Sequence, residues 1–171
     1  MESSSKWKQN TVLFLASQNI SLFGSMLVQY AILWHITLTT QSGVMMTISI
    51  ICGFIPTLLV SPFAGVWADR FNRKRLIIFA DALIALVTLG MGISFYLGEE
   101  ALWQLFVVMA LRSFGNGIQN PAVSALLPQI VPIEHLTKVN GIQGSIQSLV
   151  QIVTPMLSGA LLTLSPIEHI F

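Results

Sequence analysis

The sequence contains very little charge. Asp, Glu, Lys and Arg make up 9% of its 171 residues, whereas soluble globular domains carry about 25%. Since a water-facing surface of this size cannot be built from so few charged side chains, most of the surface must face a lipid bilayer. The net charge of +1 excludes the basic footprint of a nucleic-acid-binding protein. We therefore expect a membrane protein without a nucleic-acid partner.

The side chains that usually build catalytic or metal sites are also scarce. Cys52 is the single cysteine, so it cannot form an internal disulfide. The three histidines, His35, His135 and His169, lie far apart and lack metal-ligand spacing. No glycine-rich phosphate loop is present, which argues against ATP as an energy source. We predict that the protein is not an enzyme and holds no metal or cofactor.

Long apolar runs dominate what is present. Hydrophobic residues make up 54% of the chain, and its mean hydropathy is +0.77. Each run is long enough for the ~20 helical residues that cross a bilayer, and the ~10-residue alternating segments of a membrane barrel are absent. We predict an all-α membrane protein with five transmembrane helices, at about residues 11–38, 44–68, 76–97, 101–123 and 139–164.

The basic residues indicate the orientation of these spans. Seven of the eight Lys and Arg residues precede the first span or lie in the second and fourth connections, so they fall on one side of the membrane. The rule that cytoplasmic loops are basic then places the N-terminus in the cytoplasm of a multi-pass cell-membrane protein, and residues 165–171 outside. The fourth connection, residues 124–138, contains Pro128 and Pro132 and is expected to be a long loop.

A loop motif lies between the second and third spans. It resembles the major facilitator superfamily signature G-x-x-x-D-R-x-G-R-R/K, except that Asn72 replaces the second glycine. The resemblance implies a conformational latch, in which Asp69 pairs with the C-terminal half of the carrier in one access state. Gly65 would allow close helix approach, and Asp69 has Arg73 as a local partner. The matching residues are Gly65, Asp69, Arg70, Arg73 and Lys74.

Arg112 lies in the middle of the fourth span. It resembles the arginine of the motif R-x-x-Q-G-x-G in drug:proton antiporters, with departures at Gly115 and Asn116. A mid-span arginine costs ~2.5–3.5 kcal/mol on insertion scales, so it must face the protein interior or water. Asn116 and Gln119 fall on the same helical face. We expect Arg112 and Asn116 to act in proton coupling or substrate contact, the alternative being a structural bridge between helices.

Asp81 is an acidic residue inside the third span. Either it forms a structural ion pair with Arg112 or the loop arginines, or it relays protons. The ion pair is the slightly favoured interpretation.

Polar residues form a stripe on one face of the first span, at Gln18, Ser21, Ser25 and Gln29. In the family that the chain resembles, the first and fourth helices line the central cavity, which assigns Gln18, Ser25 and Gln29 to it. The fifth span carries a similar series, Gln143, Gln147 and Gln151, for which hydrogen bonding between helices is the favoured interpretation.

The fifth span also resembles an antiporter signature, G-x8-G-x3-G-P-x-L-G-G, with several glycines replaced. Gly141, Pro155 and Gly159 match and are expected to bend the helix and pack it closely. Residues 120–140 resemble the macrolide-efflux-like branch of the superfamily. The resemblance implies that residues 1–171 form the N-terminal transmembrane domain of a twelve-helix carrier, as an incomplete six-helix half.

The resemblance implies proton-coupled efflux of amphipathic or hydrophobic compounds such as macrolide-type drugs, and hence antibiotic resistance. The partners would be a small-molecule substrate, protons and the missing C-terminal half. The alternatives are an exporter of a siderophore or lysophospholipid and a non-transporting truncated fragment. An oligomeric carrier built of short chains is disfavoured by the odd number of spans and the asymmetric loop motif.

Overall fold

Five helices account for nearly all of the described chain. The computed structural model describes the backbone of residues 2–98 and 101–164 and the side chains of residues 7–98 and 101–161. Within these ranges there is no strand, and the predicted all-α class with five helices is confirmed. Helices suit a lipid environment because they satisfy their backbone hydrogen bonds internally. The helices are α1 (Glu2–Thr40), α2 (Gly43–Arg70), α3 (Arg73–Tyr96), α4 (Leu102–Ile130) and α5 (Ile133–Leu164).

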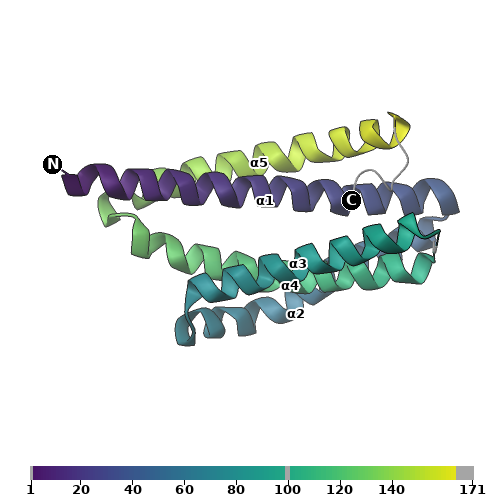
Figure 1. Cartoon of the computed structure of the whole chain (residues 1–171), viewed down its shortest axis with the longest axis horizontal. Helices are drawn as coiled ribbons and strands as arrows, with labels where there is room; N and C mark the ends of the chain where they lie inside the picture. The colour runs from purple at the N-terminus through teal and green to yellow at the C-terminus, as the bar shows by residue number, and fades with distance from the viewer. Residues whose placement is uncertain (1, 99–100, 165–171) are drawn as a thin grey trace.

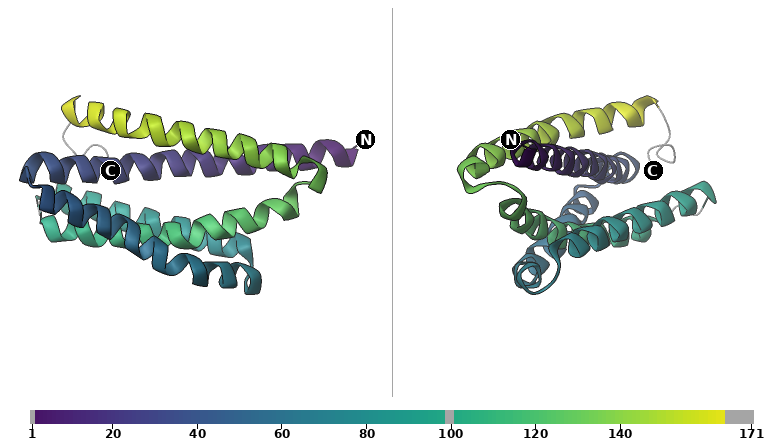
Figure 2. Two further views of the ribbon diagram at one scale, coloured as in Figure 1. Left: turned by 180° about the vertical axis from the view of Figure 1, so that it is seen from behind. Right: turned by 60° about the vertical axis from the view of Figure 1, so that its left-hand side comes forward.

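The helices form two groups that run along the same long axis. Helices α1 and α5 lie side by side, while α2 and α3 both pack on α4 (Figures 1 and 2). Helix α1 joins the groups by contacting α2 and α4. The last turns of α4 bend toward α5 (Figure 2), in the region that contains Pro121 and Pro128. Proline bends a helix because it removes a backbone hydrogen bond and clashes with the preceding turn.

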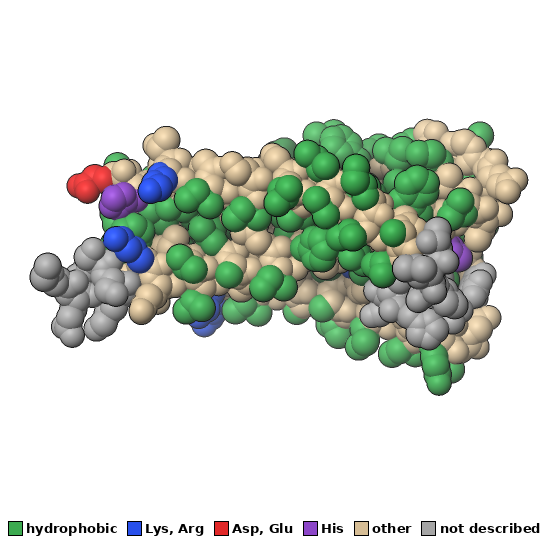
Figure 3. All heavy atoms as spheres, turned by 90° about the horizontal axis from the view of Figure 1, so that it is seen from above, with side chains coloured by type: hydrophobic (Ala, Val, Ile, Leu, Met, Phe, Trp, Pro, Cys, Tyr) green, Lys and Arg blue, Asp and Glu red, His purple; other side chains and the backbone are tan. Residues whose placement is uncertain are grey.

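Successive helices run in opposite directions, so the basic segments of the sequence meet at one end. Lys8 lies near the start of α1, Arg70 ends α2, and Lys138 lies near the start of α5. Lys and Arg side chains accordingly gather at one end of the face in Figure 3, and hydrophobic side chains cover much of the rest. Glu99, Glu100, His169 and the predicted outer segment 165–171 lie outside the described residues.

Three of the helices are long and apolar enough to cross a membrane by length and composition, at Trp7–Thr40, Gly43–Arg70 and Arg73–Tyr96. Their lipid-facing character is visible on α2, where Phe54, Leu59 and Phe63 are exposed. Helices α4 and α5 contain several Asn and Gln residues, which lower their mean hydropathy. Five crossings with the boundaries given above therefore stay a prediction.

The predicted long loop at residues 124–138 is wrong. Helix α4 continues to Ile130 and α5 begins at Ile133. Pro128 falls inside the last turn of α4, and Pro132 stands just before α5, where a missing N–H breaks no helical hydrogen bond. Pro128 is accommodated inside α4, which bends in this region, so neither proline marks a loop.

The turn between α2 and α3 contains Asn72 at the position where the family signature has a glycine, and it is not left-handed there. Asn72 has a φ of −66° and is the N-cap of α3. Its side-chain oxygen accepts a hydrogen bond from the Arg75 N–H at 3.3 Å. The asparagine is therefore suited to this position as a helix cap.

Small residues on α4 permit its close contact with α2. Thr57 donates its backbone N–H to Ser113 Oγ at 3.1 Å and its hydroxyl to the Ser113 carbonyl at 2.6 Å. One turn along, a Cβ on Gly117 would lie 3.1 Å from Thr57 Cα and 3.2 Å from its carbonyl oxygen. Because Pro56 precedes Thr57 in α2, the helix is locally perturbed there, and Ser113 supplies an acceptor for the Thr57 N–H.

Replacing Gly117 with alanine is expected to destabilise the folded protein by about 1–3 kcal/mol, since the new methyl group meets backbone atoms that cannot rotate away. The matched control is Gly90→Ala, where no atom lies within 4 Å of the new Cβ and alanine favours the helix by about 1 kcal/mol. Thermal unfolding of the purified carrier should give a lower Tm for the first variant alone. Equal Tm values would contradict the α2–α4 packing.

Candidate functional site

Arg112 is buried at the junction of three helices. Its side chain is 1% exposed, which agrees with the expectation that a mid-span arginine faces the interior. From α4, its Nη2 donates to the Ser25 carbonyl at 2.7 Å and to Ser25 Oγ at 3.0 Å. Its Nη1 donates to Thr88 Oγ1. The guanidinium group therefore connects α4 with both α1 and α3.

Asp81 forms a second polar junction of the same three helices. Its Oδ1 accepts hydrogen bonds from Ser21 Oγ at 3.1 Å and from Gln119 Nε2 at 2.7 Å. No Lys or Arg among the described side chains forms an ion pair with it within 4.0 Å. The favoured prediction of an ion pair with Arg112 or the loop arginines is therefore wrong. Arg112 instead binds neutral partners, and Asp81 has neutral donors.

Helical periodicity explains why the two junctions are stacked. Asp81 and Thr88 are seven residues apart on α3, as are Arg112 and Gln119 on α4. A spacing of seven returns to the same helical face after two turns. The predicted residues Ser25, Asp81 and Arg112 thus belong to one polar interior. Thr88 was missed by the sequence analysis, although its spacing from Asp81 was a usable signal.

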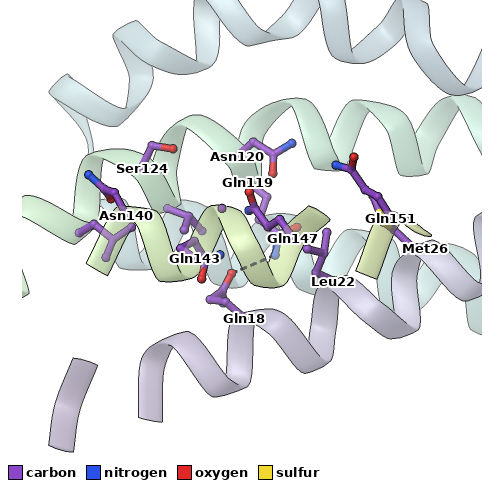
Figure 4. A pocket seen from close by; sticks show the side chains of 13 residues that line it. Gln18, Leu22, Met26, Gln119, Asn120, Ser124, Asn140, Gln143, Gln147 and Gln151 are labelled. Carbon is purple, nitrogen blue, oxygen red and sulfur yellow. Dashed lines mark hydrogen bonds between the residues drawn. The ribbon is translucent and has the colours of Figure 1, made fainter. Parts of the chain in front are cut away.

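A cavity of about 520 Å³ lies among α1, α4 and α5. Its apolar lining residues are Leu22 and Met26 of α1 and Val123 and Leu127 of α4. Polar side chains from all three helices surround the space (Figure 4). Among the described side chains that line it, none is charged. The remaining lining residues are Gln18, Gln119, Asn120, Ser124, Asn140, Gln143, Gly144, Gln147 and Gln151.

Gln119 connects this cavity to Asp81. Its Nε2 donates to Asp81 Oδ1 at 2.7 Å and to Gln18 Oε1 at 3.3 Å, and the second bond is visible in Figure 4. Both glutamines line the cavity, whereas Asp81 does not. The carboxylate is therefore one hydrogen bond behind the cavity wall.

The glutamines of α5 have different roles from one another. Gln143 accepts a hydrogen bond from Asn19 Nδ2 of α1 at 3.0 Å, which agrees with the predicted hydrogen bonding between helices. In the described part of the chain, Gln147 and Gln151 have no side-chain hydrogen bond, and both line the cavity. The prediction of a packing role is therefore wrong for these two residues.

Three other predicted cavity residues lie elsewhere. Gln29 faces α2, where a Cβ added to Gly53 would lie 2.7 Å from its Nε2, and it borders a smaller cavity with Ser49 and Met109. Asn116 is half-buried and is not among the residues that line the larger cavity. Ser25 does not line the larger cavity either, since it binds Arg112. The structure thus brings Gln18 to the larger cavity but not Ser25, Gln29 or Asn116.

The latch residues lie at the end of α2 and the start of α3. Asp69 Oδ1 is 3.7 Å from an Arg73 guanidinium nitrogen, and the Asp69 side chain is 78% exposed. Arg73 Nε also donates to the Ala68 carbonyl at 3.0 Å, while Arg70 and Lys74 are exposed. This arrangement leaves Asp69 accessible to a further partner.

The four predicted glycine and proline positions, Gly65 in the latch and Gly141, Pro155 and Gly159 in α5, are not equally closely packed. A Cβ on Gly159 would lie 3.6 Å from Trp34 Nε1, and the same nitrogen donates to the Pro155 carbonyl at 3.3 Å. No atom lies within 4 Å of a Cβ built on Gly65 or Gly141. The predicted close helix contacts at Gly65 and Gly141 are therefore not made within the described chain.

No group of three or more His, Cys, Asp or Glu residues suited to a metal ion occurs in the described ranges. The site thus consists of a buried arginine, a carboxylate with neutral donors, and a carboxamide-lined cavity.

Comparison with known proteins identifies the family. Residues 11–171 match the sequence model of the Major Facilitator Superfamily. Macrolide efflux protein A of Streptococcus pyogenes is 34% identical over 94% of this chain and 40% of its own length, and that of Enterococcus faecalis is 35% identical over 70% of this chain and 37% of its own length. The Staphyloferrin A transporter of Staphylococcus aureus is 24% identical over 89% of this chain and 38% of its own length. No solved structure matches the chain.

The chain spans about 40% of the length of the curated relatives it matches. The family match and the long apolar helices together indicate a multi-pass membrane protein. This chain belongs to the Major Facilitator Superfamily.

Proposed function

We propose that this chain is part of a proton-coupled exporter of amphipathic or hydrophobic organic compounds. The observation that carries the proposal is the position of Asp81, an acidic side chain that no described Lys or Arg pairs with, one hydrogen bond behind a ligand-sized cavity. Family membership and the similarity to two macrolide efflux proteins support export of a macrolide-type compound. Similarity to the Staphyloferrin A transporter favours a siderophore as the alternative substrate.

Asp81 and Gln119 offer a direct route from proton binding to the cavity. An ionised carboxylate only accepts hydrogen bonds, whereas a protonated one also donates. Protonation of Asp81 therefore weakens its hold on the Gln119 amide, which also binds Gln18 in the cavity wall. Any change in ligand affinity caused by the proton implies an equal change in proton affinity caused by the ligand.

Arg112 would hold the three helices in register during this cycle. It contacts α1 through Ser25 and α3 through Thr88, so relative movement of these helices must break charge-assisted hydrogen bonds. The full cycle needs a second half of the carrier, because alternating access arises when two halves rock about a central site. Transport is therefore a property of the longer protein that contains this chain.

The test is export of a radiolabelled macrolide from cells that produce the full-length carrier, with and without a protonophore. Export should stop when the proton gradient collapses, while ATP levels are held constant. Export that continues without the gradient would remove proton coupling from the proposal.

We also expect Asp69 to control the conformational cycle rather than substrate binding. Asp69→Asn should slow export up to about fivefold, since an exposed ion pair such as Asp69–Arg73 contributes about 0.2–1 kcal/mol. Macrolide affinity should stay near normal, because Asp69 lies outside the cavity. Binding and export measured on the same preparation test this expectation, and lost binding with normal turnover would refute it.

The proposed orientation has a cytoplasmic N-terminus. In a Cys52→Ser background, a cysteine at Lys74 should be protected from a membrane-impermeant thiol reagent in intact cells, and one at Leu97 should react. Both positions are exposed in the structure, so protection reports the side of the membrane. Equal labelling of the two positions would contradict the orientation.

A further inference from the structure

The amide group of Gln119 lies between two acceptor oxygens that belong to α1 and α3. Its Nε2 is 2.7 Å from Asp81 Oδ1 and 3.3 Å from Gln18 Oε1. Ser21 Oγ donates the other hydrogen bond to Asp81 Oδ1, at 3.1 Å. Both donors to the carboxylate are neutral, and no described Lys or Arg pairs with it. The negative charge of an ionised Asp81 therefore has hydrogen bonds but no counter-charge within the described chain.

This position adjoins the cavity among α1, α4 and α5. The cavity volume of about 520 Å³ falls within the ~300–1,000 Å³ of small-molecule sites. Gln18 and Gln119 both line the cavity, and Figure 4 shows the hydrogen bond between them. These two side chains and Asp81 are half-buried, so they are not sealed off from the cavity. Because glutamine is long and unbranched, Gln119 can change rotamer and leave its place to a donor group of a ligand.

The charge at this position favours a cationic donor over a neutral one. An ionised carboxylate offers about four acceptor sites, and the described donors to Asp81 use two of them. A protonated amine brings N–H donors, as the Gln119 amide does, together with a positive charge that the amide lacks. The attraction of opposite charges then adds to the hydrogen bond. An uncharged ligand has no such advantage over Gln119.

Arg112 is the buried positive charge that opposes a cation here. It binds Thr88, which follows Asp81 by seven residues on α3 and therefore lies about 10 Å further along the helix. An ammonium group that is hydrogen-bonded to Asp81 would be about 3 Å from the carboxylate oxygen. The Coulomb energy of a pair varies with the inverse of its distance, so at equal dielectric constant the attraction exceeds the repulsion roughly threefold.

We propose that the carrier binds amphipathic ligands that contain a protonated amine, and that the amine replaces the Gln119 amide between Asp81 and Gln18. This inference rests on the proposed transport function and names the class of its substrate. Apolar lining residues such as Leu22 and Val123 contact the remainder of the ligand. Gln119 thus occupies the cation position in the absence of a ligand, and Asp81 determines the specificity for charge.

The test is equilibrium binding to the purified full-length carrier, without a proton gradient. The probes are a macrolide derivative with a primary amine, its uncharged N-acetyl derivative, and its trimethylammonium derivative, which keeps the charge but has no N–H. The wild type should bind the amine roughly tenfold or more tightly than the N-acetyl derivative, as expected for a hydrogen bond to a charged group. It should also bind the amine more tightly than the trimethylammonium derivative.

Two variants separate the role of the carboxylate from that of the amide. Asp81→Asn should remove the preference for the amine and leave binding of the N-acetyl derivative near normal, because the asparagine oxygen still accepts from Ser21 and Gln119. The cavity itself is retained, so ligand exchange at saturating concentration should continue. Gln119→Leu should strengthen amine binding roughly two- to tenfold, since the ligand no longer displaces an internal donor. The matched control is Glu134→Gln, which removes an exposed carboxylate of α5 outside the cavity.

Equal binding of the amine and its N-acetyl derivative by the wild type, or a preference that survives in Asp81→Asn, would overturn the proposal. Weaker amine binding in Gln119→Leu, or tighter binding of the trimethylammonium derivative than of the amine, would refute the replacement of the amide. Export that ignores a protonophore while the binding preferences hold would refute proton coupling alone. Protonophore-sensitive export without these preferences would refute the ligand class alone.

Discussion

Replacing Arg112 with methionine is expected to reduce export at least tenfold. Methionine keeps much of the length of the side chain but removes its charge and all its hydrogen bonds to Ser25 and Thr88. Hydrogen bonds to charged groups contribute about 1.5–3 kcal/mol each, and about 1.4 kcal/mol corresponds to a tenfold change in rate. The loss of one such hydrogen bond that forms in only one access state is therefore sufficient to reduce export tenfold. The measurement is the initial rate of macrolide export by the full-length carrier.

Arg112→Lys separates charge from geometry. Lysine retains the positive charge, but its single ammonium group cannot reproduce the planar fork that reaches both α1 and α3. We expect Arg112→Lys to recover little of the lost export. The matched control is Arg75→Met, because Arg75 is exposed at the start of α3. Normal abundance and normal export in Arg112→Met would show that the buried guanidinium has no part in transport.

Replacing Asp81 with asparagine is expected to abolish gradient-driven export while preserving exchange. The asparagine oxygen can still accept from Ser21 and Gln119, so the local hydrogen bonds survive. The side chain can no longer bind or release a proton, which removes the coupling step. Uphill export should fall more than roughly tenfold, whereas exchange of labelled for unlabelled macrolide across proteoliposomes should continue.

Asp69→Asn is the matched control for this experiment, since the same substitution is made at an exposed carboxylate. Slower conformational exchange should reduce both uphill export and counterflow in Asp69→Asn. Asp81→Asn should reduce only the uphill export. Uphill export at the wild-type rate in Asp81→Asn would assign the titrating group to another part of the carrier.

Several properties of the protein were evident from its residues alone. The apolar runs required lipid, and backbone hydrogen bonding in lipid required helices, so five helices followed from composition and periodicity. The mid-span position of Arg112 required burial, because an exposed guanidinium in the bilayer is unfavourable. The residues 65–75 and 112–117 identified the family because their spacing repeats a known motif. These conclusions depend on the local sequence and on the surrounding solvent, so they can be drawn from the sequence of a single chain.

The ends of the helices were less predictable. Pro128 and Pro132 suggested a loop, yet one lies in a helix and the other just before the next. Pro132 precedes the first turn of α5, where the missing N–H breaks no helical hydrogen bond, whereas Pro128 removes one hydrogen bond near the end of α4 without ending the helix. Asn72 stands where the family signature has a glycine, and only the structure shows that its side-chain oxygen accepts the Arg75 N–H as a helix cap.

Only the tertiary structure decided which polar side chains meet. A sequence gives the face on which Asp81 or Gln147 lies, but the neighbour on that face depends on how the helices pack. Close contact of α4 with α2 and α3 needs Gly115 and Gly117, and it turns Arg112 toward Ser25 and Thr88, so that Asp81 receives neutral donors. The pairing of α5 with α1, and the bend of α4, open the cavity that Gln147 lines. The packing of the helices selects among hydrogen-bond partners of similar strength. The spacing of residues along one helix does not predict which partner is selected.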